Sequence, residues 1–390
     1  MRGAASRRSR QLLRAAGLVL VLFPGLAPGL AFAQADPEAR SYLEVGTEMP
    51  LKGNAPINGY AFFLWNRPHF PEPDQYLRVV VAPTYLLTEL VVDHWPFGRH
   101  AVSVGLNGGG LRYGHFEYRN GSYKDAESFW GHGAELPLSY YASTKLFDKL
   151  PLQGQIRVTP AFIVYQDSFG TAERFELPPD TGLLTGRVGL RLGGIPPELL
   201  PQLALEASAW YEAVYRTNPG TFGLPERSPE TLEDLTQRAW GRLAAVLKPT
   251  EGHTLDILLT AGLTRSTDLL SSFRMGSALP FRSEFPLILH GYFVEEVFAK
   301  RFWLLNLSYR FPAWPGSRNV HLRISGDIAG VEYVDGHRLP REHLRGVGGD
   351  VSVAITPQVT VVAGYGYGFD APRNDGFGGH EAHALIELKF

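Results

Sequence analysis

Apolar and polar side chains alternate with period two along much of the chain, and the pattern is clearest toward its C terminus. Over residues 359–369, valine, alanine and aromatic side chains fall on one face, while threonine, valine and glycine fall on the other. The same alternation runs over 302–311, 319–333 and 347–356. Successive side chains of a strand point to opposite faces, so this period indicates strands rather than helices. The pattern predicts an all-β protein.

Aromatic side chains gather on the apolar faces of these strands. Tyr365, Tyr367 and Phe369 stand at the end of one strand, and Trp303 and Tyr309 lie along another. A soluble sandwich turns its apolar face into a core, where aromatic residues have no reason to collect at strand ends. In a transmembrane barrel, lipid contacts the apolar face and aromatic girdles mark the membrane interfaces. We therefore expect a transmembrane antiparallel β-barrel, closed because every backbone amide within lipid needs a partner.

Turn signals divide the alternating segments into strands whose connections are alternately long and short. Long polar connections are expected on the external side of an outer-membrane barrel and short ones on the periplasmic side. Direct counting gives 14 strands, an even number with consistent sidedness. They lie near residues 57–66, 77–91, 98–118, 133–147, 152–166, 183–194, 201–217, 237–248, 253–265, 302–311, 319–333, 347–356, 359–369 and 383–390.

The last strand runs to the terminal carboxylate. Ile386, Leu388 and Phe390 share its apolar face, and Glu387 and Lys389 lie between them. A terminal strand that ends in phenylalanine resembles the sorting signal of bacterial outer-membrane barrels, which the barrel-insertion machinery reads. The strand predicts a location in the bacterial outer membrane, with that machinery as a partner during biogenesis and outer-membrane lipids as the surroundings.

The N terminus has the pattern of a secretory signal peptide over residues 1–35. Five arginines precede an apolar stretch that ends in an A-x-A motif at residues 31–33. Residues 36–56 are then expected to form a short periplasmic segment, and residues 57–390 the barrel.

Composition removes several classes of function. The chain has no cysteine, which excludes thiol nucleophiles and zinc sites built on CxxC motifs, and we expect no cofactor. All 39 acidic residues lie beyond residue 35, whereas five of the 37 basic residues fall within the first 14. The exported chain is therefore acidic, which argues against a nucleic-acid partner.

Catalytic and metal sites are not predicted either. We find no convergent Ser/His/Asp constellation, so we do not expect an enzyme. His380, Glu381 and His383 in the "GHEAH" stretch have spacing that a metal site would allow. We favour the interpretation that they are polar positions of a lumen-facing strand, because no further ligand is identifiable. Glu295 and Glu296 are interpreted as solvated loop residues rather than as charges lining a path.

One long connection, residues 266–301, is too apolar for a surface loop, and we expect it to fold back into the lumen. It contains the start of "HGYFVEEVFAKRFWLLNLSYRFP", which precedes a strand with a GD pair, a "VGGDVSVAITP" hairpin, "VVAGYGYGFD" and the terminal strand. This order of elements resembles the C-terminal third of the Omp85 superfamily barrel, also called the bacterial surface antigen (D15) type. The resemblance covers about residues 266–390.

The resemblance implies a barrel of 16 strands, against the direct count of 14, with the inward loop before the fifth-last strand. Missing strands are expected within 36–56 or 271–280. The family's loop tip reads Arg-Gly-Tyr/Phe and is held by acidic residues of the inner wall. Here the tip is His290, Gly291 and Tyr292, so histidine replaces arginine. The candidate inner-wall partners are Asp327, Ser308 and Arg323. We expect His290 to pack beside Asp327, and its protonation to strengthen the loop's anchorage.

The resemblance also frames the function. Members of the superfamily that assemble or secrete proteins carry periplasmic POTRA domains of roughly 75 residues ahead of the barrel, and we expect none here. Two functions therefore stay open: assisting the insertion or translocation of a protein or lipid, and serving as a passive or substrate-specific pore or a structural barrel. An insertase needs a weak seam between the first and last strands, whereas a pore needs an unobstructed lumen.

Overall fold

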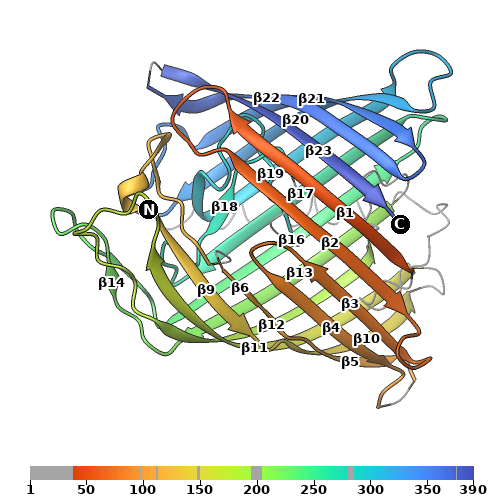
Figure 1. Cartoon of the computed structure of the whole chain (residues 1–390), viewed down its shortest axis with the longest axis horizontal. Helices are drawn as coiled ribbons and strands as arrows, with labels where there is room; N and C mark the ends of the chain where they lie inside the picture. The colour runs from red at the N-terminus through yellow and green to blue at the C-terminus, as the bar shows by residue number, and fades with distance from the viewer. Residues whose placement is uncertain are drawn as a thin grey trace, which may run out of the picture.

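The computed structural model describes residues 38–96, 98–110, 113–146, 150–194, 204–279, 285–374 and 376–390. Within these residues the strands form a closed antiparallel barrel of 16 wall segments (Figure 1). The expected signal peptide lies outside the described residues. No helix in the described part of the chain is long and apolar enough to span a membrane.

The wall strands follow one another around the barrel in chain order. They are β1 (Arg40–Pro50), β2 (Asn58–Pro68), β3 (Gln75–Val81), β4 (Leu86–Asp93), β5 (His100–Val104) with β6 (Asn107–Gly109), β9 (Phe129–Glu135) with β10 (Leu138–Leu146), β11 (Leu150–Asp167), β12 (Thr181–Gly194), β13 (Ala204–Arg216), β16 (Leu235–Leu247), β17 (Thr254–Arg265), β19 (Val297–Pro312), β20 (Val320–Tyr333), β21 (His343–Thr356), β22 (Val359–Arg373) and β23 (Gly376–Lys389). Two of these crossings are interrupted, one between β5 and β6 and one between β9 and β10.

Five further elements lie at one end of the barrel. They are β7 (Tyr118–Arg119), β8 (Ser122–Tyr123), the 3-10 turn η1 (Asp125–Glu127), β14 (Thr221–Phe222) and β15 (Glu230–Thr231). The short strand β18 (Phe273–Met275) pairs with the start of β19. This end carries the connections 110–128, 217–234 and 266–296, whereas Phe390 lies at the other end. Because periplasmic turns are short and external loops long, the end with these connections is the external one.

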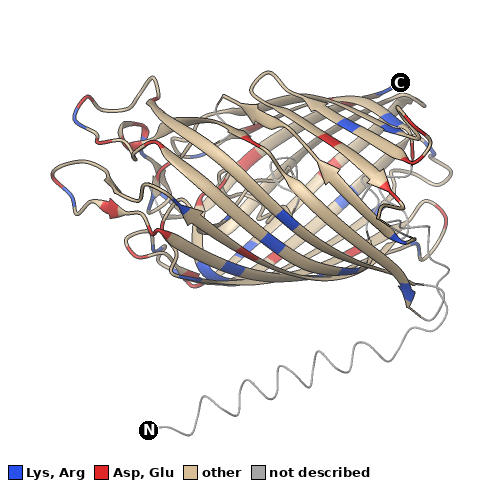
Figure 2. Ribbon diagram, turned by 90° about the horizontal axis from the view of Figure 1, so that it is seen from below, with Lys and Arg blue, Asp and Glu red and all other residues tan. Residues whose placement is uncertain are grey.

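The wall strands show the inverted polarity expected of a membrane barrel. In β21, Val347, Val351 and Ile355 are exposed on the outside, while Asp350 and Ser352 between them are buried inside. Charged residues occur in the wall strands as well as in the loops at both ends (Figure 2). Alternation that sends valine and isoleucine out and carboxylates in is the arrangement that lipid outside and a polar lumen inside favour.

Counting strands directly from the sequence gave two too few. The segment 36–56 is not a short periplasmic extension, because its residues 40–50 form β1, a full wall strand. Glu44 and Glu48 point inward from β1, so its sequence shows a weaker apolar pattern than the strands predicted from the sequence. The predicted single strand 77–91 is two strands, β3 and β4, joined by a short external turn at 82–85. The barrel of 16 strands implied by the family resemblance is confirmed.

β1 and β23 close the barrel (Figure 1). They pair antiparallel in register from Tyr42 with Lys389 to Pro50 with Glu381. We call this pairing the seam. The backbone N–H of Phe390 also donates to the carbonyl of Ser41 at 2.8 Å, so the pairing continues to the last residue. A closed hydrogen-bonded circuit leaves no strand edge in lipid.

Candidate functional site

The described residues of the connection between β17 and β19 pack against the inner wall of the barrel. We call residues 266–279 and 285–296 the lumen loop; β19 starts at Val297, earlier than the predicted residue 302. Leu289 and Tyr292 of the loop are fully buried against Leu304 and Leu344 of the wall. Apolar side chains that would be costly in water thus gain a core inside the barrel, which explains why this loop is so apolar.

His290 and Asp327 meet as the sequence suggested. Oδ2 of Asp327 accepts the backbone N–H of His290 at 2.8 Å and lies 2.6 Å from its ring Nδ1. The amide of Asn306 donates to the other carboxylate oxygen at 2.6 Å, and also to the carbonyl of Ile288 at 2.9 Å. The hydrogen bonds to the Asp327 carboxylate thus come from β19 and the loop tip. The role of His290 protonation stays a prediction.

The other two predicted inner-wall partners do not reach the loop tip. Ser308 donates to Asp256 of β17 at 2.8 Å, and Arg323 donates to Asp350 of β21 at 2.6 Å. Both side chains lie on the periplasmic side of Asp327 along their strands, so each pairs with a neighbouring wall strand instead. Asn306, which the sequence analysis did not select, takes the position beside Asp327.

Glycines make room for the loop tip on the inner wall. Gly291 has a φ of +79°, and a Cβ there would lie 1.8 Å from the backbone nitrogen of Gly368. A Cβ on Gly348 would overlap the ring of His290, and one on Gly368 would overlap Tyr292. Within the "GYGYG" stretch, the close approach of the loop therefore requires a glycine at residue 368, whereas a Cβ on Gly364 or Gly366 would meet wall side chains, His383 or Glu381 of β23.

A buried ion pair holds the far end of the lumen loop to β22. Nη1 of Arg373 lies 2.8 Å from Glu296, and both side chains are 0% exposed. Arg373 also stacks on Phe293 and donates to the carbonyl of Gly291 at 3.2 Å. Glu296 in turn accepts the backbone N–H of Phe293 at 2.8 Å. The interpretation of Glu296 as a solvated loop residue was wrong; it is an anchor of the loop.

The lumen loop also binds the first strand of the barrel. Ser277 donates to Glu48 of β1 at 2.6 Å, and the backbone N–H of Ala278 donates to the same oxygen at 3.1 Å. With Asp327 on β20 and Arg373 on β22, the loop has anchors on both sides of the seam. The docked loop therefore crosses the inside of the seam and connects β1 to β20 and β22.

Carboxyl groups line the inner face of the seam. Glu44 and Glu387 are directly opposite one another, and Glu48 and Glu381 line one small cavity of about 10 Å³ next to the loop. All four side chains are buried. Lys389 pairs with Glu387 at 3.2 Å from the same strand. Two carboxyl groups that face one another form no ion pair across the strands, so this face gives the seam none of the stabilisation that opposite charges give a strand pair.

Other strand pairs of the wall place opposite charges face to face. Inward pairs join β3 to β4, β12 to β13 and β20 to β21. They are Arg78 with Glu89, Arg187 with Glu212, and Arg323 with Asp350. Like charges also face one another at Arg157 with Arg187 and at Arg310 with Arg323, but Arg157, Arg187 and Arg323 each have a carboxylate partner on another strand. His383, which faces Glu48 across the seam, has no hydrogen-bond partner for either ring nitrogen. Among the described residues, no group of three or more potential ligands has a geometry that would hold a metal ion.

The predicted sorting residues lie where a terminal strand should place them. Ile386 is exposed on the lipid-facing side of β23, and Phe390 is exposed beyond it at the periplasmic end. The ring of Phe390 packs edge-on against Phe63 of β2. Recognition of these residues by the insertion machinery stays a prediction.

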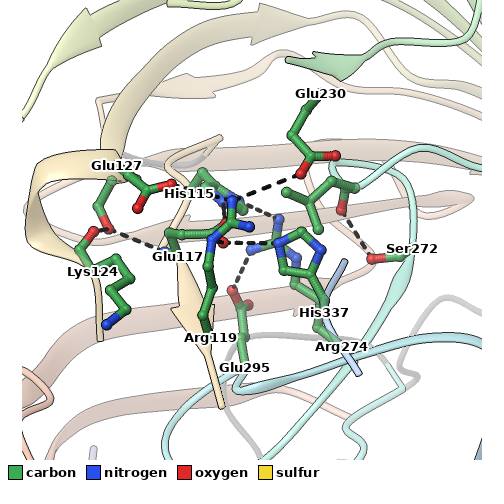
Figure 3. Close-up of polar contacts among 12 residues, drawn as sticks. His115, Glu117, Arg119, Lys124, Glu127, Glu230, Ser272, Arg274, Glu295 and His337 are labelled. Atoms are coloured by element: carbon green, nitrogen blue, oxygen red, sulfur yellow. Dashed lines mark hydrogen bonds and ion pairs between the residues drawn. The ribbon is translucent and has the colours of Figure 1, made fainter. Parts of the chain in front are cut away.

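A second polar cluster joins the external loops (Figure 3). Glu117 is its centre, and we call His115, Glu117, Arg119, Arg274 and His337 the Glu117 cluster. The carboxylate of Glu117 lies 2.7 Å from His115, 2.8 Å from His337 and 2.8 Å from Arg119. These residues come from the 110–128 connection, from β18 in the lumen loop and from the connection between β20 and β21. One buried carboxylate thus connects three separate external segments, and we call this arrangement the latch.

The hydrogen bonds fix the charges of the two histidines. Nη2 of Arg274 lies 2.8 Å from Nδ1 of His115. Arginine can only donate, so Nδ1 accepts, Nε2 donates to Glu117, and His115 is neutral. His337 faces Glu117 with Nε2 and the carbonyl of Asp335, 3.1 Å away, with Nδ1. Both of its nitrogens therefore donate, and His337 is positively charged.

The pKa shifts of the two histidines agree with this assignment of their charges. Burial lowers the pKa of His115 to about 4. Burial opposes the charged form of His337 too, but the hydrogen bond and charge of Glu117 outweigh it and raise the pKa of His337. Burial alone would raise the pKa of Glu117, yet the hydrogen bonds from both histidines hold it well below its usual range.

These shifts predict that the latch is most stable near pH 6.5 and weakens on both sides. As the pH falls below the ordinary histidine pKa of about 6.5, the unfolded loops bind a proton at His115 that the folded cluster does not, which costs stability down to about pH 4. As the pH rises above about 6.5 through the raised pKa of His337, the contribution of its positive charge is lost. Glu117 contributes fully throughout this window, since its stabilisation is lost only when the pH falls through its lowered pKa.

Hydrogen exchange of residues 113–128 and 334–342, corrected for intrinsic rates, would measure this profile. His115→Gln should remove the loss on the acid side, and His337→Gln the loss on the alkaline side. The other charges that face the cluster are Glu127 and Glu230 beside Arg119 and Glu295 beside Arg274. Burial raises the pKa of Glu230. Protection that is flat from about pH 5 to about pH 9 would contradict the charge assignment.

The architecture is that of a bacterial outer-membrane β-barrel. The sequence matches no protein-family model and no curated protein at a significant level. Solved structures do match in fold. CdiB from Acinetobacter baumannii aligns with a TM-score of 0.59 and 11% identity over 90% of this chain and 60% of that one. CdiB from Escherichia coli aligns with a TM-score of 0.58 and 11% identity over 95% of this chain and 68% of that one.

BamA from Haemophilus ducreyi, in a structure lacking POTRA domains 1–3, aligns with a TM-score of 0.57 and 8% identity. The match covers 90% of this chain and 71% of that one. CdiB and BamA belong to the Omp85 superfamily, so the chain has an Omp85-type barrel fold. It spans 60% of the length of the first CdiB chain. At these identities the likeness shows the fold alone.

Proposed function

We propose that this barrel assists the insertion of other proteins into the outer membrane by opening its seam. The observation that carries the proposal is the inner face of the seam, where the carboxyl groups of Glu44 and Glu387 face one another, whereas β12–β13 and β20–β21 place opposite charges face to face. A strand pair without such ion pairs separates at lower cost than the pairs that have them. Separation frees the edges of β1 and β23 to pair with an incoming strand.

The lumen loop supplies the control in this mechanism. Glu48 holds the loop on the β1 side, and Asp327 and Arg373 hold it on the other side. Docking of the loop thus opposes separation of the seam, and release of the loop removes that constraint. No catalytic group is needed, because the incoming strand gains its free energy from backbone hydrogen bonds and from burial of its apolar face in lipid.

Depletion of the protein in the bacterium that encodes it tests the proposal. Quantitative proteomics of the outer-membrane fraction should show other barrels falling together while their transcripts hold steady. A wild-type copy supplied in trans should restore them. If the fraction is otherwise unchanged, the insertion role is wrong, and conductance of the purified barrel would then test whether it is a pore.

A further inference from the structure

Two arginines at the external rim of the barrel share one buried carboxylate. Nη1 of Arg341 lies 2.8 Å from Asp370, and Arg345 contacts the same group through Nε at 2.9 Å and Nη2 at 3.0 Å. The side chain of Asp370 is 1% exposed, whereas those of Arg341 and Arg345 are 49% and 53% exposed. Two positive charges meet one negative charge, so the group carries a surplus positive charge at the surface.

This group stands on the lipid-facing side of the wall. Arg345 shares the outward row of β21 with Val347. Its guanidinium lies 5.8 Å from the ring centroid of Phe369, and that of Arg341 lies 4.6 Å from that of Phe377. Both rings are exposed. Aromatic residues in such a row mark the membrane interface, the depth at which an arginine on the lipid face costs least.

We propose that Arg341 and Arg345 bind a phosphate group of an outer-leaflet lipid headgroup, of the kind that lipid A carries. The bonds to Asp370 use one nitrogen of Arg341 and two of Arg345, so each guanidinium keeps further N–H donors. Guanidinium groups bind phosphate through paired hydrogen bonds, and Asp370 holds both in fixed orientations beforehand. A phosphate would neutralise the surplus charge at the level where the external headgroups lie.

Arg341→Gln is the sharpest variant, because it removes the surplus charge and leaves Asp370 paired with Arg345. Arg301→Gln is the matched control. Arg301 is also exposed on the outward row at the external end, but it pairs one-to-one with Glu332 at 3.4 Å. Heat-modifiable migration in electrophoresis would verify that each variant is a folded barrel.

Binding would be measured on the purified protein in detergent micelles, titrated with lipid A that carries both phosphates, with dephosphorylated lipid A, or with inorganic phosphate. We expect Arg341→Gln to weaken binding of phosphorylated lipid A about tenfold, with no change for Arg301→Gln and weak binding of the dephosphorylated lipid to all three proteins. Equal affinity of Arg341→Gln and wild type would overturn the proposal, as would equal binding of dephosphorylated lipid A. Displacement of lipid A by millimolar inorganic phosphate would assign the site to the free anion and overturn the lipid as its ligand.

Discussion

Replacing Glu296 with alanine should lower the free energy of unfolding by about 3–5 kcal/mol, because it leaves the charge of Arg373 buried without its partner. The two side chains are fully buried and 2.8 Å apart. The substitution also removes the acceptor of the Phe293 N–H, which is buried with the loop. Urea unfolding of the protein refolded into lipid vesicles, followed by tryptophan fluorescence, would measure the change.

Two further variants separate the buried charge from a general effect of substitution. The double variant Glu296→Gln/Arg373→Met removes both charges at similar volume and should recover part of the loss. Asp335→Ala breaks the Lys300–Asp335 pair, which has a contact of 2.7 Å but an exposed carboxylate, and should cost about 1 kcal/mol or less. A double variant as unstable as Glu296→Ala alone would show that charge burial is not the cause.

Replacing Gly291 with alanine should release the loop tip from the inner wall. A Cβ at Gly291 would lie 1.8 Å from the backbone nitrogen of Gly368, and a wall strand cannot move aside without losing its ladder. The substitution adds this overlap to the cost of about 1–2 kcal/mol for a non-glycine residue at positive φ. Hydrogen exchange of residues 285–296 should therefore become much faster.

Gly316→Ala is the control for backbone strain. Gly316 has a φ of +83°, close to the +79° of Gly291, but a Cβ there would meet nothing within 4 Å. It lies in the periplasmic turn between β19 and β20. We expect Gly316→Ala to show only the cost of backbone strain, with the hydrogen-exchange protection of the lumen loop unchanged. Equal loss of protection in both variants would mean that the contact with Gly368 does not hold the tip.

The class of fold could be predicted from the sequence because lipid-facing apolar residues alternate with lumen-facing residues along each strand of a membrane barrel. Strands such as β21 and β22 alternate valine and aromatic residues with small or polar ones, and that period survives any detail of packing. β1 was missed because two of its inward positions are charged, Glu44 and Glu48, which makes the segment resemble a polar extension. β3 and β4 were merged because both are short and the turn between them contains few turn residues.

The site was predictable only where a motif marked it. The loop tip and Asp327 followed from the family resemblance, and the structure brings them together. Glu296 with Arg373 and the Glu117 cluster join residues 77 and 220 positions apart, and one sequence carries no signal of such contacts. The seam carboxylates were visible as charges, but only strand register could show that Glu44 faces Glu387.

Joining the seam covalently tests the central claim most directly. The chain has no cysteine, so paired cysteines can be introduced without interference. Val45 and Ile386 face one another across the seam, and Val361 faces Ile386 from the other side, within the β22–β23 pair. Val45→Cys/Ile386→Cys therefore locks the seam, and Val361→Cys/Ile386→Cys is a control that shares one position and leaves the seam free.

Each variant would be expressed in depleted cells, and the oxidised protein compared with the reduced one by proteomics of the outer membrane. The account predicts that the oxidised seam variant fails to restore the other barrels, that reduction rescues it, and that the oxidised control restores them. Restoration by the oxidised seam variant to the level of the control would contradict the account.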